Sequence, residues 1–76
     1  MSTYRYKNPA PIIEKAHEIG AKFRSWISGD VAYAYSEVTA RKKEIVWHVV
    51  WQTSFGEFPE RMSDKWFHKM LKPIGG

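Results

Sequence analysis

The segment DVAYAYSEVTARKKEIVWHVVWQT, residues 30–53, decides the fold of this chain. Residues 31–38 alternate two interleaved sets of side chains, and residues 44–53 do the same with a higher density of Val, Ile and Trp. Such β-branched and aromatic residues lose rotamer freedom in a helix and pack well on a pleated surface. We therefore predict a β-hairpin with residues 39–43 as its loop. One long helix over residues 30–53 is the alternative, because apolar spacings of three and four also occur there.

A helix is predicted on each side of this hairpin. Apolar residues recur at spacings of three and four from Ile12 to Ile27, and Gly20 lies inside that stripe. A second helix is predicted from near Pro59 to the residue before Pro73, with Ser63 as an alternative start. Residues 3–7 alternate tyrosine with polar side chains, which indicates a short strand before the first helix.

Together these elements predict an α+β domain of order β-α-β-β-α, with both helices on one face of a small antiparallel sheet. Seventy-six residues suffice for one domain, expected to span residues 1–74 with 75–76 as a flexible tail. The absence of cysteine excludes a disulfide framework and thiolate metal sites. No apolar run is long enough to cross a bilayer and no signal peptide is recognised, so we expect a cytoplasmic protein without a membrane partner.

The distribution of basic residues predicts a nucleic-acid partner. The formal net charge is +4 and the pI is about 9.5, which suits a polyanion. The helix that ends before Pro73 would align a stripe of cations, and the hairpin loop would carry a second basic cluster at its tip. The stripe consists of Arg61, Lys65, Lys69 and Lys72, and the tip consists of Arg41, Lys42 and Lys43. The leading prediction is thus a small, non-enzymatic, regulatory nucleic-acid-binding protein; the competing interpretation is that these charges only solvate the surface.

Aromatic side chains on the hairpin predict a second kind of surface. If the smaller residues of each strand pack beneath the helices, four aromatics face outward as a stacking platform or as a protein interface. They are Tyr33, Tyr35, Trp47 and Trp51. A protein-interaction module, such as an inhibitor, an adaptor or a homodimer, is therefore the alternative function. The competing interpretation is that these aromatics form the core.

Catalysis has the least support in the sequence. His17, His48 and His68 are far apart and show no metal-ligand spacing, so neither a metal nor another cofactor is predicted. The remaining enzymatic alternative is a metal-free RNase toxin in which His48 acts as the general base. A histidine between valine and tryptophan is more often a hydrogen-bonded structural residue.

Overall fold

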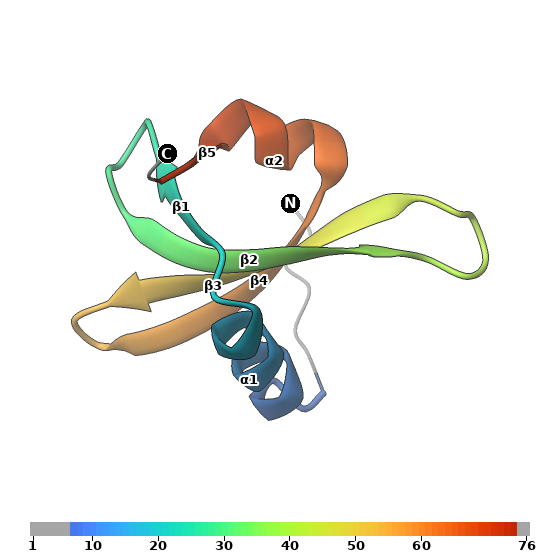
Figure 1. Ribbon diagram of the computed structural model, residues 1–76, viewed down its shortest axis with the longest axis horizontal. Helices are drawn as coiled ribbons and strands as arrows, with labels where there is room; N and C mark the ends of the chain where they lie inside the picture. The colour runs from blue at the N-terminus through green and yellow to red at the C-terminus, as the bar shows by residue number, and fades with distance from the viewer. Residues whose placement is uncertain (1–6, 75–76) are drawn as a thin grey trace.

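The computed structural model describes residues 7–74 and shows a five-stranded antiparallel sheet with one helix on each side (Figure 1). The strand order in the sheet is β4-β3-β2-β1-β5. The elements in chain order are α1 (Ala10–Ile19), β1 (Lys22–Ser25), β2 (Val31–Val38), β3 (Ile45–Thr53), β4 (Gly56–Ser63), α2 (Asp64–Met70) and β5 (Leu71–Pro73). The predicted α+β class, with two helices on an antiparallel sheet, is confirmed.

The central hairpin is formed by β2 and β3. Their register runs from Val31 opposite Gln52 to Val38 opposite Ile45. The alternative of one long helix over residues 30–53 is therefore wrong. The predicted strand over residues 3–7 lies outside the described residues except for Lys7, and residues 75–76 lie outside them as well. No helix in the described part of the chain is long and apolar enough to span a bilayer.

The first helix ends much earlier than its apolar stripe predicts. Gly20 has a φ of 77°, and its backbone N–H donates to the carbonyl of Ala16 at 2.9 Å. A left-handed glycine of this kind terminates a helix, since a residue with a Cβ adopts that conformation at a cost. The prediction that the helix continues to Ile27 is wrong. Residues 22–25 instead form β1, in which Phe23 points into the core and Arg24 is exposed.

The second helix begins at the alternative start. The Ser63 hydroxyl accepts the backbone N–H of Trp66 at 3.3 Å and so caps α2. The prediction of a helix from near Pro59 is wrong, because residues 56–63 form β4 against β3. Phe58 and Met62 are four apart, and this even spacing places two side chains on one face of a strand as well as of a helix.

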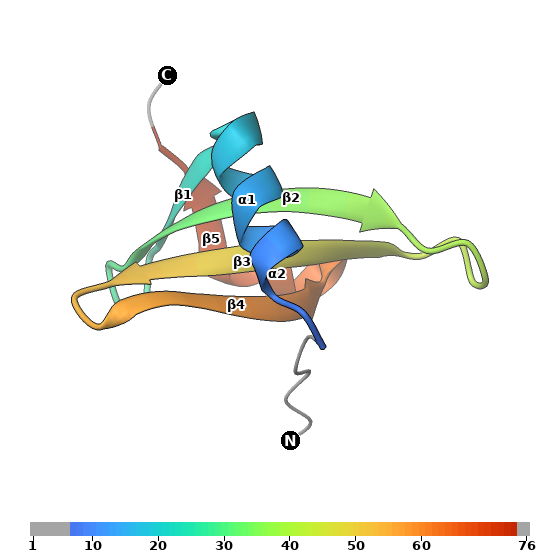
Figure 2. The same ribbon diagram turned by 90° about the horizontal axis from the view of Figure 1, so that it is seen from below.

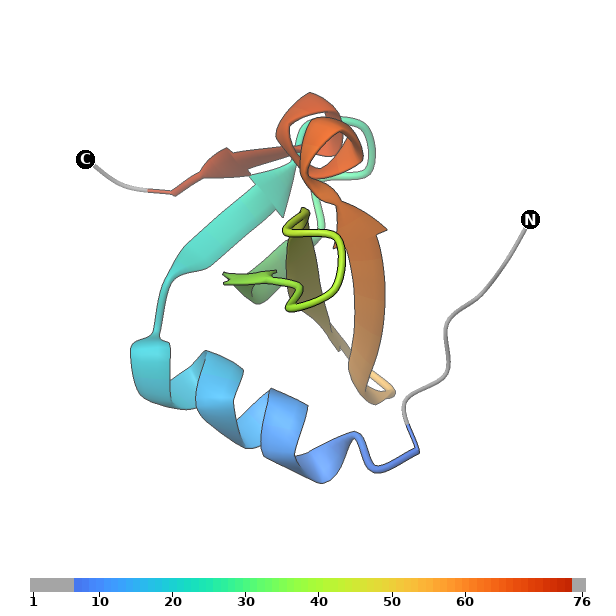
Figure 3. The ribbon, with the colours of Figure 1, turned by 90° about the vertical axis from the view of Figure 1, so that its right-hand side faces the viewer.

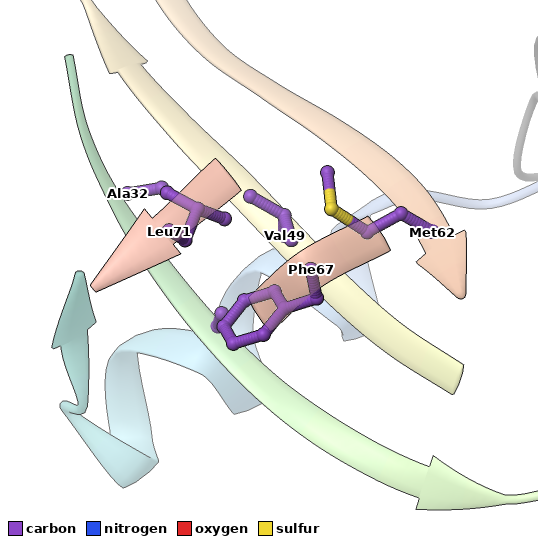
Figure 4. Close-up of a cluster of buried hydrophobic side chains, with 6 residues drawn as sticks. Ala32, Val49, Met62, Phe67 and Leu71 are labelled. Carbon is purple, nitrogen blue, oxygen red and sulfur yellow. The ribbon is translucent and has the colours of Figure 1, made fainter. Parts of the chain in front are cut away.

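The two helices lie on opposite faces of the sheet, so the prediction that they share one face is wrong (Figures 1 and 2). Both faces of the central strands are apolar, and each face therefore needs its own cover. The α2 side has a core of Ala32, Ala34, Val49, Met62, Phe67 and Leu71 (Figure 4), and the α1 side has a smaller one of Ala16, Tyr35 and Val50.

Phe67 anchors α2 to the sheet. Its ring stacks on Trp47, with centroids 3.8 Å apart and the planes 2° from parallel, and meets Phe23 edge to face at 5.0 Å. The small side chains of Ala32 and Ala34 leave room on β2 for this aromatic cluster. Phe67 is therefore the side chain of α2 that is buried in this core (Figure 4).

Candidate nucleic-acid interface

The β2–β3 hairpin extends beyond the rest of the sheet as a two-stranded arm. β1 pairs with β2 only as far as Tyr33, and β4 pairs with β3 only as far as Val46. Residues 37–46 therefore continue without a third strand beside most of their length, and the turn at residues 39–44 points away from the body of the molecule (Figures 1 and 3). We call residues 37–46 the arm.

The turn of the arm is held by hydrogen bonds around Thr39. The Thr39 backbone N–H donates to the Glu44 carbonyl at 2.8 Å, and the Thr39 hydroxyl accepts the Glu44 N–H at 3.1 Å. Lys43 has a φ of 53° and its N–H donates to the Thr39 carbonyl at 2.9 Å. These bonds give the backbone of the tip a defined shape.

The sequence prediction placed three cations at this tip, and the structure puts them there. Arg41, Lys42 and Lys43 are all exposed, and none of them forms an ion pair with any residue between 7 and 74. Of the two acidic residues that flank the tip, Glu37 is bonded to His48 Nε2 at 2.7 Å. Glu44, the other flanking acid, is exposed directly after Lys43, so residues 37–46 hold three cations and two carboxylates and carry a net charge of +1.

Acidic side chains elsewhere bind ring and amide N–H groups rather than lysine or arginine. Asp64 accepts the indole N–H of Trp47 at 2.8 Å, and Glu60 accepts that of Trp51 at 2.7 Å. Within the described chain, the ion pairs recorded are His17 with Glu57, His48 with Glu37, and His68 with Asp64. Four carboxylates in this part of the chain are therefore engaged by histidine, tryptophan or glutamine side chains.

The stripe predicted for residues 61–72 does not exist as a continuous helix ridge. Lys65 and Lys69 lie one turn apart on α2 and are exposed. Arg61 lies in β4 opposite His48, on the α1 side of the sheet, and makes a contact of its own. Lys72 lies in β5 opposite Arg24. The prediction of four aligned cations is wrong, because strand pairing turns the first and last of them away from the helix.

The predicted aromatic platform is also wrong. The register sets Trp51 opposite Ala32 and Trp47 opposite Ser36, so both tryptophans lie on the α2 side of the sheet. Tyr33 and Tyr35 lie on the α1 side. They are further covered there: His17 packs on Tyr33 with centroids 4.3 Å apart, and the ammonium groups of Lys22 and Lys15 lie over Tyr33 and Tyr35 at 5.5 and 5.1 Å.

His48 is buried beside these tyrosines. His48 is 5% exposed, its ring centroid lies 4.9 Å from that of Tyr35, and its Nε2 is hydrogen-bonded to the Glu37 carboxylate. Burial, together with the nearby Glu37 carboxylate, raises the pKa of Tyr35 above its usual value. A general base must reach the proton that it abstracts. The burial of His48 therefore argues against its use on an RNA substrate and for a structural role.

A hydrogen-bonded group ties α1 to the edge of the sheet. Glu57 in β4 accepts from the Gln52 amide at 2.9 Å and bonds His17 of α1. These two bonds hold the pKa of Glu57 below its usual value, with the Gln52 bond as the larger cause. No three of the His, Asp and Glu side chains between residues 7 and 74 gather as a metal-ligand set.

Sequence reasoning missed one surface feature, a hollow at the β1–β5 edge of about 320 Å³. It is lined by Arg24, Trp26, Lys72, Pro73 and Ile74. The signal was present in residues 22–30, where Lys22 and Arg24 alternate with Phe23 and Ser25 before a Ser-Gly-Asp turn. Residues 22–25 also fit the apolar helix spacing over residues 12–27, so they were assigned to the helix and not to a strand. Comparison with known proteins found no matching family, no similar curated sequence and no similar solved structure.

Proposed function

We propose that this protein binds nucleic acid through the arm, holding phosphates with the cations at its tip rather than reading bases. The observation that carries the proposal is the set of three adjacent, exposed cations without an ion pair to any residue between 7 and 74. Cations placed along a phosphodiester release condensed counterions, which supplies affinity with little sequence discrimination. Regulation of the bound nucleic acid is the corresponding biological role.

The shape of the arm suits this use. A two-stranded ribbon is narrow enough to enter the major groove of a duplex or to lie along a single strand. Val38 and Ile45 face one another just below the tip and are 61% and 45% exposed. Apolar side chains beside cations are what proteins use to contact sugars and base edges once phosphates are held.

A second contact is proposed on α2. Ser63, the cap of α2, pairs with Val46 at the base of the arm, so the first turn of the helix starts beside it. Lys65 and Lys69 both lie on the exposed surface of this short helix. These two residues of the predicted stripe do lie together on one helix, and we propose that they bind phosphates of the same strand that the arm holds.

The test is a salt titration of binding to labelled oligonucleotides, read by fluorescence anisotropy. Removing two phosphate contacts with Arg41→Gln and Lys42→Gln lowers the steepness of the log–log salt dependence by roughly 1.4 on a single strand or 1.8 on a duplex. Lys7→Gln with Lys15→Gln is the matched control, since it removes two exposed cations outside the arm.

The outcomes separate clearly. An unchanged salt slope in the control, with a shallower slope in the arm variant, supports the proposal. Equal weakening by both variants means that binding follows net charge alone and contradicts a role for the arm. Salt-insensitive binding by the parent protein contradicts phosphate recognition altogether.

A protein partner is the second candidate function, and one observation favours it. The β1–β2 and β3–β4 connections both lie at the end of the sheet opposite the arm (Figure 1), and each carries an exposed apolar side chain. Phe55 is 93% exposed and Ile27 is 64% exposed. Exposed apolar surface of this kind is typical of an interface. Sedimentation of the purified chain tests self-association, and Phe55→Ser should abolish a dimer that forms through this end.

A further inference from the structure

The hollow at the β1–β5 edge lies apart from the arm, on the side of the sheet that α1 only partly covers. Lys22 is paired with Tyr33, which packs against α1, so Lys22 and Arg24 face the α1 side of the sheet. α1 packs over β2, β3 and β4. The outer strands β1 and β5 are therefore left open on this face, and the hollow occupies that opening.

Two cations lie side by side in the lining of the hollow. Arg24 and Lys72 are directly opposite across the β1–β5 pair, so their side chains emerge side by side. Neither forms an ion pair with a residue between 7 and 74, and no carboxylate lines the hollow. Like charges in directly opposed positions repel and destabilise a sheet. An anion bound between them would remove this repulsion.

The third wall is an exposed tryptophan whose ring is fixed. The Trp26 indole N–H donates to the Lys69 carbonyl at 2.5 Å, and its backbone N–H donates to the Met70 carbonyl at 3.3 Å. The residue is nevertheless 65% exposed. An aromatic side chain that is anchored through its N–H and largely exposed suits a planar ligand, because little conformational entropy is lost on stacking.

We propose that this hollow binds one unpaired nucleotide of a nucleic-acid strand, with the base against Trp26 and a phosphate between Arg24 and Lys72. The proposal rests on the nucleic-acid function above and names its substrate class: single-stranded nucleic acid, or a duplex with an unpaired segment. Stacked bases next to phosphates are the units that aromatic side chains and cations recognise together in single-strand binding. A paired base inside a duplex cannot reach the ring.

The experiment compares a labelled single strand with a blunt duplex of the same length, for the parent protein and three variants. Trp26→Ala should weaken single-strand binding by about 5- to 150-fold and leave duplex binding unchanged. Trp26→Phe keeps a stacking ring and should retain most of the affinity. Phe58→Ala removes another exposed aromatic side chain, 52% exposed on β4, and should leave both affinities unchanged.

A second measurement covers the case in which Trp26→Ala disturbs the fold. The Trp26 indole N–H signal in a two-dimensional ¹H–¹⁵N spectrum is identified by its loss in Trp26→Phe. The single strand should shift this signal, and Arg24→Gln with Lys72→Gln should weaken binding while preserving the folded spectrum. Adenosine 5′-monophosphate should shift the same signal only at much higher concentration, since it lacks the phosphates that reach the arm.

The failures are distinguishable. If oligonucleotides bind through the arm and the Trp26 and Arg24/Lys72 variants keep the parent preference between single strand and duplex, this inference is overturned and the proposed function stands. If no oligonucleotide binds, the proposed function is overturned, and this inference with it. If adenosine 5′-monophosphate or an acidic aromatic peptide binds the hollow as tightly as the strand, the ligand class is wrong.

Discussion

Replacing Phe67 with alanine is the most direct test of how α2 packs on the sheet. Phe67 is 1% exposed and has aromatic contacts with Trp47, Phe23 and His68. Its neighbour Trp66 lies on the same short helix and is 53% exposed. The two aromatics are adjacent in sequence, so the structure alone predicts that their removal has very different effects.

The expected magnitude follows from burial. Removing a fully buried phenylalanine costs about 3–5 kcal/mol, through lost apolar transfer and the cavity left behind. At roughly 0.05–0.15 kcal/mol per residue, a chain of this length has a total stability of about 4–11 kcal/mol. Phe67→Ala therefore removes about a quarter or more of the stability, and lowers Tm by at least about 12 °C. Trp66→Ala should cost less than about 1 kcal/mol.

Urea denaturation followed by far-ultraviolet circular dichroism measures both variants, and Phe67→Leu covers the case in which Phe67→Ala does not fold. Leucine keeps most of the apolar volume but loses the ring contacts, so a cost of about 1–2 kcal/mol is expected. Equal losses for Trp66→Ala and Phe67→Ala, or a larger loss for Trp66→Ala, would refute the orientation assigned to α2.

Three further predictions concern the termini of the helices and the edge of the sheet. Folding lowers the pKa of Glu57, so the ionised carboxylate stabilises the folded state above the ordinary value of 4.5, and this stabilisation is lost as the pH falls through the lowered pKa. In Glu57→Gln, the urea midpoint should therefore decrease less between about pH 6 and pH 3 than it does in the parent protein. Gly20→Ala should cost about 1–2 kcal/mol, since φ is 77°, and an unchanged Tm would contradict the left-handed helix end. Ser63→Ala should cost about 0.5–2 kcal/mol by removing the cap of α2, whereas Ser54→Ala, at an exposed turn, should change stability by less than about 0.5 kcal/mol; equal effects would argue against the cap.

The hairpin and its basic tip were predictable because they depend on local sequence. The density of β-branched and aromatic residues between 44 and 53 opposes a helix wherever the segment is placed. The loop joining two paired strands must carry Arg41, Lys42 and Lys43 away from the ladder. No contact with a distant residue is needed for either inference, and both agree with the structure.

The basic stripe was not predictable because its spacing has two meanings. Residues four apart share a face in a helix and also in a strand. Arg61 belongs to β4 and Lys72 to β5 because those segments pair with β3 and β1. Pairing with distant strands outweighs the local helical preference of such short segments, so Arg61 and Lys72, at the two ends of the stripe, lie in strands and not in the helix.

The aromatic residues show the same division. Alternation along each strand of the hairpin correctly separates two sets of side chains. Which set of β2 shares a face with which set of β3 depends on the register, and that register puts Tyr33 opposite Val50 and Ala32 opposite Trp51. A register shifted by one residue would have placed the tyrosines of β2 and the tryptophans of β3 on the same face of the sheet.

The amino-acid sequence by itself determined that this chain forms an α+β domain around a hairpin with a basic tip, because rotamer preference and turn position act over a few residues. Only the tertiary structure decided that the helices cover opposite faces and that Arg24, Trp26 and Lys72 meet in one hollow. The physical reason is that both outcomes follow from burying two apolar sheet faces at once, a condition that no single segment expresses.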